Sequence, residues 1–307
     1  MGNKVLPKPL MGIIPPLVTP LLDSDTLDTA GFQKLINHVI DGGVHGIFVL
    51  GTTGEAPSLS YRLRKEVIKR SCEFAGGRVP VLVGISDTSF VESVNLCTYS
   101  AECGADAVVL APPFYFPAGQ AELLEYLQHL VPKLALPLFL YNMPTHTKLV
   151  FEPSTVRAAA DIPGIIGLKD SSANMVYFHK LQLLFKERAD FSLLVGPEEL
   201  LAETLLLGGH GGINGGANLW PSLYVSIYNA AQKRDLDTVM KLHEKVIQVS
   251  SSVYSVGKYS SSYLKGLKCG LSLLNICSDF MAEPFHKFRA EERESIRKHL
   301  TSLGILK

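Results

Sequence analysis

Short apolar runs rich in β-branched residues recur along the chain, and each run ends in small or polar residues. Eight of them follow one another at intervals of about 20 to 35 residues, the spacing of alternating strands and helices. Strands that are apolar at nearly every position are typical of parallel strands covered by helices on both faces. The eight predicted strands are 12–20, 46–52, 79–85, 105–113, 137–142, 165–171, 191–196 and 211–218.

Apolar residues at helical spacing fill the segments between these strands. The first predicted helix follows Asp28, a suitable N-cap, and ends at Gly42 and Gly43. Eight strand–helix units predict an α/β fold, a (β/α)8 TIM barrel. A doubly wound sheet is the alternative, but it usually has a glycine-rich phosphate turn after its first strand, where this chain has Val18 and Thr19.

The strand signal stops after residue 234, and only helical patterns follow. They cover 236–249, 258–274 and 283–300. We therefore expect two parts, a catalytic barrel of residues 1–234 and a C-terminal helical region of residues 235–307. Because no Ser- or Gly-rich linker separates the two parts, the helical region is expected to pack on the barrel or on a neighbouring subunit.

Charge and composition narrow the classes of partner. The 29 Lys and Arg residues balance 29 Asp and Glu residues, which leaves no long-range field to attract nucleic acid or an anionic membrane. The five cysteines are an odd number without a CxxC pair, and residues 1–4 lack the apolar run of a signal peptide. A cytoplasmic protein with no nucleic-acid and no membrane partner is expected.

No metal or other cofactor is expected either. The nine histidines form no HxH or HExxH pattern, and the cysteines have no metal-ligand spacing. The glycine-rich run at 208–216 resembles the phosphate loop of many barrels, but no Arg or Lys adjoins it. Its glycines are expected to let the backbone approach a small uncharged or carboxylate ligand, with tight turns as the alternative.

Chemistry-bearing residues gather where the predicted strands end, which is where barrels place their active sites. The segments are GTTGE at 51–55, FY at 114–115, YNMP at 141–144 and GLKDS at 167–171. Lys169 ends an apolar strand, where lost hydration favours the neutral, nucleophilic amine. Tyr141 ends the preceding strand and is a candidate for proton transfer.

Thr52 and Thr53 offer hydroxyl and backbone N–H groups between Gly51 and Gly54, a construction that binds a carboxylate or an oxyanion. Each of these interpretations has a structural alternative. Lys169 can instead pair with Asp170 or extend its amine to the barrel rim, Tyr141 can be a core aromatic residue, and the threonines can simply cap a turn.

Together, the four motifs and the GGHGGI segment at 208–213 resemble the dihydrodipicolinate synthase and N-acetylneuraminate lyase family of Schiff-base aldolases, in order and spacing along essentially the whole barrel. The resemblance implies that Lys169 condenses with the keto carbon of pyruvate, and that the imine is the electron sink for making or breaking the adjacent C–C bond. It implies Tyr141 as the proton-transfer residue, and Thr52 with Tyr115 as a hydroxyl relay.

The resemblance also implies partners. Gly51, Thr52 and Thr53 would hold the carboxylate of pyruvate, and Ile213 lies in the segment that matches the family's eighth strand. In relatives the tyrosine that matches Tyr115 typically crosses a tight dimer interface. A homodimer or homotetramer is therefore expected.

Substrate specificity is expected to depend on positions at which dihydrodipicolinate synthases and N-acetylneuraminate lyases differ from each other. Dihydrodipicolinate synthases usually have an arginine at the place of His146, where it binds the carboxylate of the aldehyde partner, and a mostly neutral imidazole cannot replace it. Their lysine-inhibitor site commonly has histidines where this chain has Tyr61 and Arg64. N-acetylneuraminate lyases bind sugar hydroxyls through a G-x-D-E segment, where this chain has Gly196, Pro197, Glu198 and Glu199. They also have a sugar-binding threonine in place of Ser171 and a serine in place of Gly215.

The sequence therefore favours a lyase that releases pyruvate from a 2-keto-3-deoxy sugar acid or a related hydroxylated 2-oxo acid. Condensation of pyruvate with aspartate semialdehyde is the first alternative, and dehydration through the same imine is another. From a different class, the barrel could be a non-catalytic module that binds pyruvate. The presence of Lys169, Tyr141, Tyr115 and Thr52 together argues against that last alternative.

Overall fold

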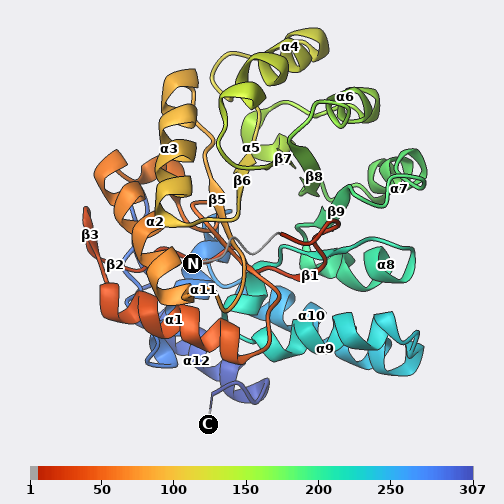
Figure 1. Ribbon diagram of the computed structural model, residues 1–307. Coiled ribbons are helices and arrows are strands. Elements are labelled where there is room, and N and C mark those ends of the chain that lie inside the picture. Colours follow the sequence, from red (N-terminus) through yellow and green to blue (C-terminus); the bar gives the residue numbers. More distant parts are fainter. Residues whose placement is uncertain (1–5, 307) are drawn as a thin grey trace.

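The computed structural model describes residues 6–306, and eight parallel strands form its central sheet (Figure 1). Residues 1–5, which include the segment expected to lack an export signal, lie outside the described part. Along the sheet the strands are β1 (Gly12–Ile13), β10 (Gly211–Gly212), β9 (Ser192–Val195), β8 (Ile165–Asp170), β7 (Leu138–Asn142), β6 (Ala107–Leu110), β5 (Val81–Gly84) and β4 (Ile47–Val49).

The two ends of this sheet meet beside β1. Pro16 pairs in parallel with Phe48 of β4, and the Leu17 N–H donates to the Phe48 carbonyl at 2.8 Å. The sheet therefore curls into a (β/α)8 TIM barrel, and the predicted fold class is confirmed. All eight strands lie within predicted segments, although each is shorter because the predicted ranges included residues of the flanking loops.

Helices surround the barrel (Figure 1). Asp28 caps the first helix as predicted, since its side chain accepts from the Gly31 N–H at 2.9 Å. The helices of the barrel are α1 (Thr29–Asp41), α2 (Tyr61–Ala75), α3 (Phe90–Cys103), α4 (Gln120–Leu130), α5 (Pro144–Thr147), α6 (Pro153–Ala159), α7 (Met175–Leu184), α8 (Leu201–Leu206) and α9 (Pro221–Gln232), with 3₁₀ turns η1 (Ala56–Ser58), η2 (Val131–Lys133), η3 (Glu198–Leu200) and η4 (Gly215–Asn218).

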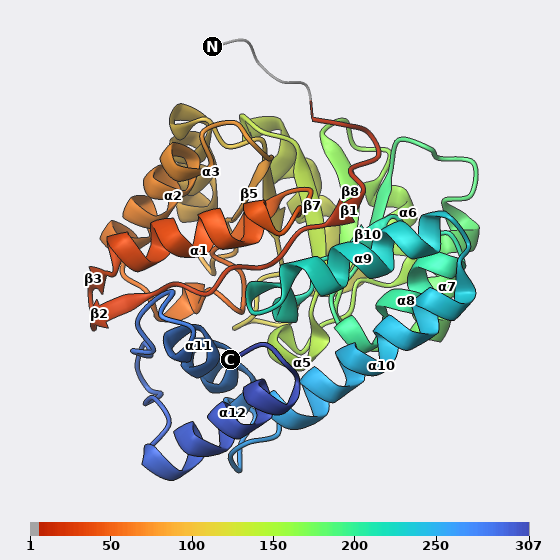
Figure 2. The same ribbon diagram turned by 90° about the horizontal axis from the view of Figure 1, so that it is seen from below.

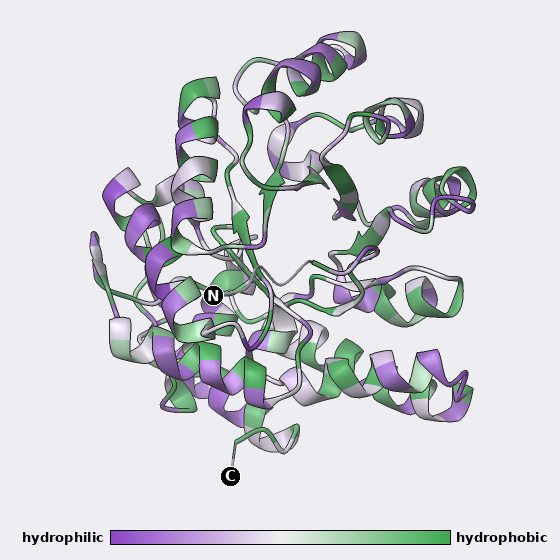
Figure 3. Cartoon of the chain, viewed as in Figure 1, coloured by the Kyte–Doolittle hydropathy of each residue, from purple (hydrophilic) through white to green (hydrophobic). Residues whose placement is uncertain are grey.

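Side chains of each strand alternate between two apolar layers. In β6, Val108 and Leu110 pack toward the helices, whereas Ala107 and Val109 pack inside the barrel. The strands accordingly carry mainly hydrophobic colours in Figure 3. This alternation matters for function, because every second side chain at a strand end points toward the mouth of the barrel.

A short hairpin before α1 was not predicted from the sequence pattern. It pairs β2 (Leu21–Asp23) with β3 (Thr26–Leu27) in antiparallel fashion. Strands of two or three residues are too short to produce a recognisable alternation.

Three helices follow the barrel, as expected from the sequence. They are α10 (Leu236–Val253), α11 (Ser262–Leu273) and α12 (Ala290–Ser302), and α10 packs along α9. The last helix begins later than predicted, because Pro284 interrupts the pattern and the Glu292 carboxylate caps the helix start at the Arg289 N–H, 3.0 Å away. Figure 2 places the three helices on the same side of the barrel as α5, which follows β7.

None of the helices within residues 6–306 combines the length and the apolar character that crossing a membrane requires.

Candidate active site

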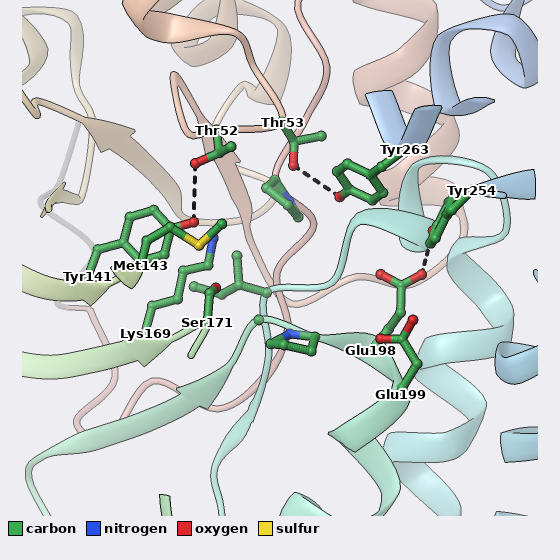
Figure 4. Close-up of a pocket in the computed structure, with 14 residues that line it drawn as sticks. Thr52, Thr53, Tyr141, Met143, Lys169, Ser171, Glu198, Glu199, Tyr254 and Tyr263 are labelled. Atoms are coloured by element: carbon green, nitrogen blue, oxygen red, sulfur yellow. Dashed lines mark hydrogen bonds between the residues drawn. The ribbon is translucent and has the colours of Figure 1, made fainter. Parts of the chain in front are cut away.

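A pocket opens at the C-terminal ends of the barrel strands (Figure 4). Its lining brings together most of the residues singled out in the sequence, from β7, β8, and the loops after β4, β9 and β10. Of the predicted residues, these line the pocket: Thr52, Thr53, Tyr141, Lys169, Ser171, Gly196, Glu198, Glu199 and Ile213.

Lys169 lies near the end of β8, directly beside Tyr141 of β7 in the strand register. Its side chain is buried, and Nζ lies 4.0 Å from the centre of the Tyr141 ring. Among the described residues no carboxylate is within ion-pair distance of it. The neighbouring Asp170 instead accepts from Asn142 Nδ2 at 2.8 Å and from the Ser172 hydroxyl at 2.9 Å. Lys169 is therefore free to meet a ligand.

The Tyr141 hydroxyl lies 3.2 Å from the Thr52 Oγ1 atom. Burial acts to raise the pKa of Tyr141, but the Lys169 ammonium and hydrogen bonds from Thr52 and Ser171 outweigh it, and the net pKa lies below the usual value. A phenol with a lowered pKa exchanges its proton more readily near neutral pH.

The GTTGE segment forms a tight turn after β4. A Cβ atom on Gly51 would come within 2.6 Å of the Phe48 ring, so the turn requires glycine there. The Thr19 hydroxyl donates to the Gly54 carbonyl at 2.7 Å and holds the turn from the barrel side. No described residue accepts a hydrogen bond from the Thr52 or Thr53 N–H, so both groups are available to a carboxylate.

Glu198 begins η3 and is only 3% exposed. Its Oε1 atom accepts from the Tyr224 hydroxyl at 2.8 Å and from the Tyr254 hydroxyl, and Oε2 accepts from the Gly216 N–H at 3.2 Å. Burial, together with the neighbouring Glu199, raises the pKa of Glu198 to about 7. Glu199 itself is exposed at the pocket wall.

Three predicted residues lie outside the pocket lining. Gly51 shapes the turn from behind, and His146 is exposed in α5, with Nδ1 3.0 Å from the Thr145 hydroxyl. Tyr115 follows β6 and is 77% exposed, with its ring packed edge-on against Phe116.

Other lining residues were missed. Tyr254 and Tyr263 come from the helical region after the barrel, where a search of strand ends does not look. The sequence held one signal, the glycine at position 215: a Cβ atom there would lie 1.7 Å from the Tyr263 hydroxyl. Met143, Pro16 and Pro197 complete the lining. No group of three or more His, Cys, Asp or Glu side chains within residues 6–306 is arranged to hold a metal ion.

A model of the dihydrodipicolinate synthetase family matches residues 9–303. The chain belongs to this family. Relatives in it are named synthases or aldolases, and the protein is accordingly a lyase of the dihydrodipicolinate synthetase family. The resemblance inferred from the sequence motifs is confirmed.

Similar members of the dihydrodipicolinate synthetase family are named for different reactions. A probable 2-dehydro-3-deoxy-D-pentonate aldolase of Escherichia coli is 32% identical over 97% of this chain and 99% of its own. A solved dihydrodipicolinate synthase of Bacteroides thetaiotaomicron is 62% identical, with a TM-score of 0.94 over 96% of this chain and 99% of that one. A prophage protein of this family from E. coli, solved with pyruvate, is 28% identical, with a TM-score of 0.91 over 96% and 99%.

Proposed function

We propose that the protein is an aldolase that cleaves a 2-keto-3-deoxy sugar acid, or a related hydroxylated 2-oxo acid, into pyruvate and an aldehyde. The observation that carries this proposal is the distribution of charge around the pocket. Lys169 is the only Lys or Arg among the described lining residues, and Glu198 and Glu199 lie on the wall away from it. Such a site suits a substrate with one carboxylate and several hydroxyls.

In the proposed reaction the neutral amine of Lys169 attacks the keto carbon, and water leaves to give a protonated imine. The Thr52 and Thr53 N–H groups bind the carboxylate beside it. Tyr141, deprotonated through Thr52, takes the proton of the C4 hydroxyl. The C3–C4 bond then breaks, its electron pair moves toward the imine nitrogen, and the aldehyde departs. Protonation of the enamine and hydrolysis release pyruvate and restore Lys169.

Condensation of pyruvate with aspartate semialdehyde is the second candidate. The 62% identical Bacteroides protein, named a dihydrodipicolinate synthase, favours it. Aspartate semialdehyde carries a carboxylate of its own, and a buried carboxylate without a cationic partner is strongly disfavoured. His146, at the position of the synthases' arginine, is exposed outside the lining. The pocket therefore fits the first candidate better.

Two measurements test the proposal in order. Borohydride reduction with pyruvate is expected to leave an adduct on Lys169, detected by mass spectrometry, and the Lys169→Ala variant is the control. A panel of 2-keto-3-deoxy sugar acids is then expected to yield pyruvate, with weak or no condensation of aspartate semialdehyde. Absence of the adduct overturns the mechanism and leaves the binding-module alternative. An adduct with efficient condensation of aspartate semialdehyde assigns the synthase activity instead.

We further propose that the protein acts in the cytoplasm as a homodimer or homotetramer. The unpaired state of all five cysteines supports a reducing compartment. The exposure of Tyr115 and Phe116, two large aromatic side chains on one loop, supports self-association at that loop.

A further inference from the structure

Two tyrosines of the pocket wall opposite Lys169 come from the helical region after the barrel. Tyr254 follows the last residue of α10, Tyr263 lies in α11, and both point into the pocket (Figure 4). Their rings pack edge to face with centres 4.8 Å apart. This wall faces the part of a substrate beyond the bond that breaks, because Lys169 and the two threonines hold the pyruvate end.

The hydrogen bond that Tyr254 donates determines whether its hydroxyl can donate to a ligand or accept from it. Its O–H donates to Glu198 Oε1, so the proton of the phenol is already engaged and only oxygen lone pairs remain toward the pocket. Burial and the nearby Glu198 carboxylate raise the pKa of Tyr254 well above the usual value, which keeps the phenol neutral. A neutral acceptor attracts a substrate hydroxyl and offers nothing to a second carboxylate.

Tyr263 is held in place from two directions. Its hydroxyl lies 3.1 Å from Thr53 Oγ1, and it occupies the space that a side chain at position 215 would need. Lys268, farther along α11, forms a buried ion pair with Glu55 of the GTTGE segment and donates to the Phe280 carbonyl at 2.7 Å. The helix that carries Tyr263 is thereby fixed to the turn that carries Thr52 and Thr53.

We infer that Tyr254 and Tyr263 are specificity-determining residues that hydrogen-bond with the distal hydroxyls of the substrate, Tyr254 as an acceptor, and that Glu198 is a positioning residue that acts through Tyr254. This inference rests on the proposed aldolase function. It assigns to Glu198 an indirect role, because its oxygens are already occupied by two tyrosine hydroxyls and the Gly216 N–H.

A ratio of two substrates tests this inference. The first substrate is a 2-keto-3-deoxyhexonate, and the second is 4-hydroxy-2-oxopentanoate, which undergoes the same cleavage without hydroxyls beyond C4. In Tyr254→Phe the kcat/KM value for the hexonate, divided by that for the pentanoate, is expected to fall about tenfold. The loss corresponds to one hydrogen bond, because a distal hydroxyl of the hexonate is left without its acceptor. Tyr263→Phe is expected to lower the ratio in the same direction.

Tyr224→Phe is the matched control. It removes the other hydroxyl that donates to Glu198 Oε1, but Tyr224 is fully buried and does not line the pocket, so the ratio should stay within about twofold of the wild-type value. Glu198 has its own test. Glu198→Gln keeps an oxygen that accepts from Tyr254 and should retain most of the selectivity, whereas Glu198→Ala should lose it.

The pyruvate adduct on Lys169 is measured for every variant, because it reports an intact barrel independently of the wall. An unchanged ratio in Tyr254→Phe, in an enzyme that cleaves both substrates, overturns the inference and leaves the aldolase function standing. A wild-type protein that forms the adduct but cleaves neither substrate overturns the proposed substrate class, and the inference with it.

Discussion

The charge of Lys169 contributes most to the lowered pKa of Tyr141. The ring is buried, which disfavours a phenolate, yet Lys169, 4.0 Å from its centre, reverses the direction of the pKa shift together with hydrogen bonds from Thr52 and Ser171. Once Lys169 is an imine, its nitrogen is again positive, so the same partner supports the phenolate during bond cleavage. Nucleophile and proton carrier are therefore coupled through one contact between adjacent strands.

Tyr141→Phe is expected to lower kcat by about 10² to 10⁴, because a positioned proton-transfer group is lost, while the pyruvate adduct still forms. Thr52→Val should follow the same pattern less severely, since Thr52 acts through its contact with Tyr141. Steady-state kinetics and borohydride trapping measure the two effects separately. If Tyr141→Phe keeps nearly the full kcat, the Tyr141 hydroxyl has only a structural role.

Glu198 should make the stability of the fold depend on pH. The pKa of Glu198, about 7, lies above the ordinary value of 4.5, so the folded state binds the proton more tightly than the unfolded state. Protonation of Glu198 therefore adds to the free energy of unfolding below pH 4.5, and this contribution is lost as the pH rises through 7. The difference corresponds to about 3 kcal/mol. Urea unfolding at pH 4.5 and pH 8 should show that Glu198→Gln lacks this loss.

Glu244→Gln is the control for that experiment, because it removes one acid from an exposed position of α10 that does not contribute to the pKa of Glu198. Equal pH dependence of unfolding in the wild-type protein and in Glu198→Gln would mean that Glu198 does not carry this titration.

At the scale of elements, α11 is joined to the loop after β4 by the Lys268–Glu55 pair. Both side chains are buried, and Glu55 also accepts from the Ala282 N–H at 2.9 Å. Burial lowers the pKa of Lys268, and Glu55 opposes this effect. The motif that binds the pyruvate carboxylate in our proposal is therefore also the attachment point of the C-terminal helices.

Lys268→Ala is expected to lower the free energy of unfolding by about 3 to 5 kcal/mol, because it leaves Glu55 buried without its partner. Lys298→Ala, which removes an exposed lysine of α12, should change it by less than about 0.5 kcal/mol. Urea unfolding compares the two. Similar losses in both variants would show that the buried pair does not hold α11 in place.

The barrel elements were predictable from sequence for a physical reason. Parallel strands buried on both faces leave nearly uninterrupted apolar runs, and their ends converge at one rim, so the sequence pattern alone places Lys169 and Tyr141 together. The position of Tyr263 was not predictable in this way. It depends on how α11 packs over the rim, which local periodicity does not encode. Glycine at position 215 leaves the space that Tyr263 fills, but the sequence does not show which side chain fills it.

At the scale of the whole molecule, Tyr115 of a single chain is exposed and does not line the pocket of that chain. If copies associate through this loop, as we propose, each active site takes its Tyr115 from a neighbouring subunit. The protein should then sediment as a dimer or tetramer, and a mixture of inactive Lys169→Ala with weakly active Tyr115→Ala should regain turnover after subunit exchange.

The regained activity comes from mixed pairs, in which the chain that keeps Lys169 receives an intact tyrosine from its partner. Lys169→Ala mixed with Tyr141→Phe is the control, because both residues belong to the pocket of one chain and no such exchange supplies a complete site. A monomer that turns over fully with Tyr115→Ala would contradict the proposed assembly.

The close approach of Tyr263 to Gly215 also constrains how such a pocket can evolve. A serine at position 215 would collide with the tyrosine hydroxyl, since even its first carbon would lie 1.7 Å away. A lineage that changes from Tyr263 with Gly215 to a serine at position 215 is therefore expected to replace Tyr263 first, and the opposite change to restore the glycine first. The residues at positions 215 and 263 should therefore be correlated among related proteins.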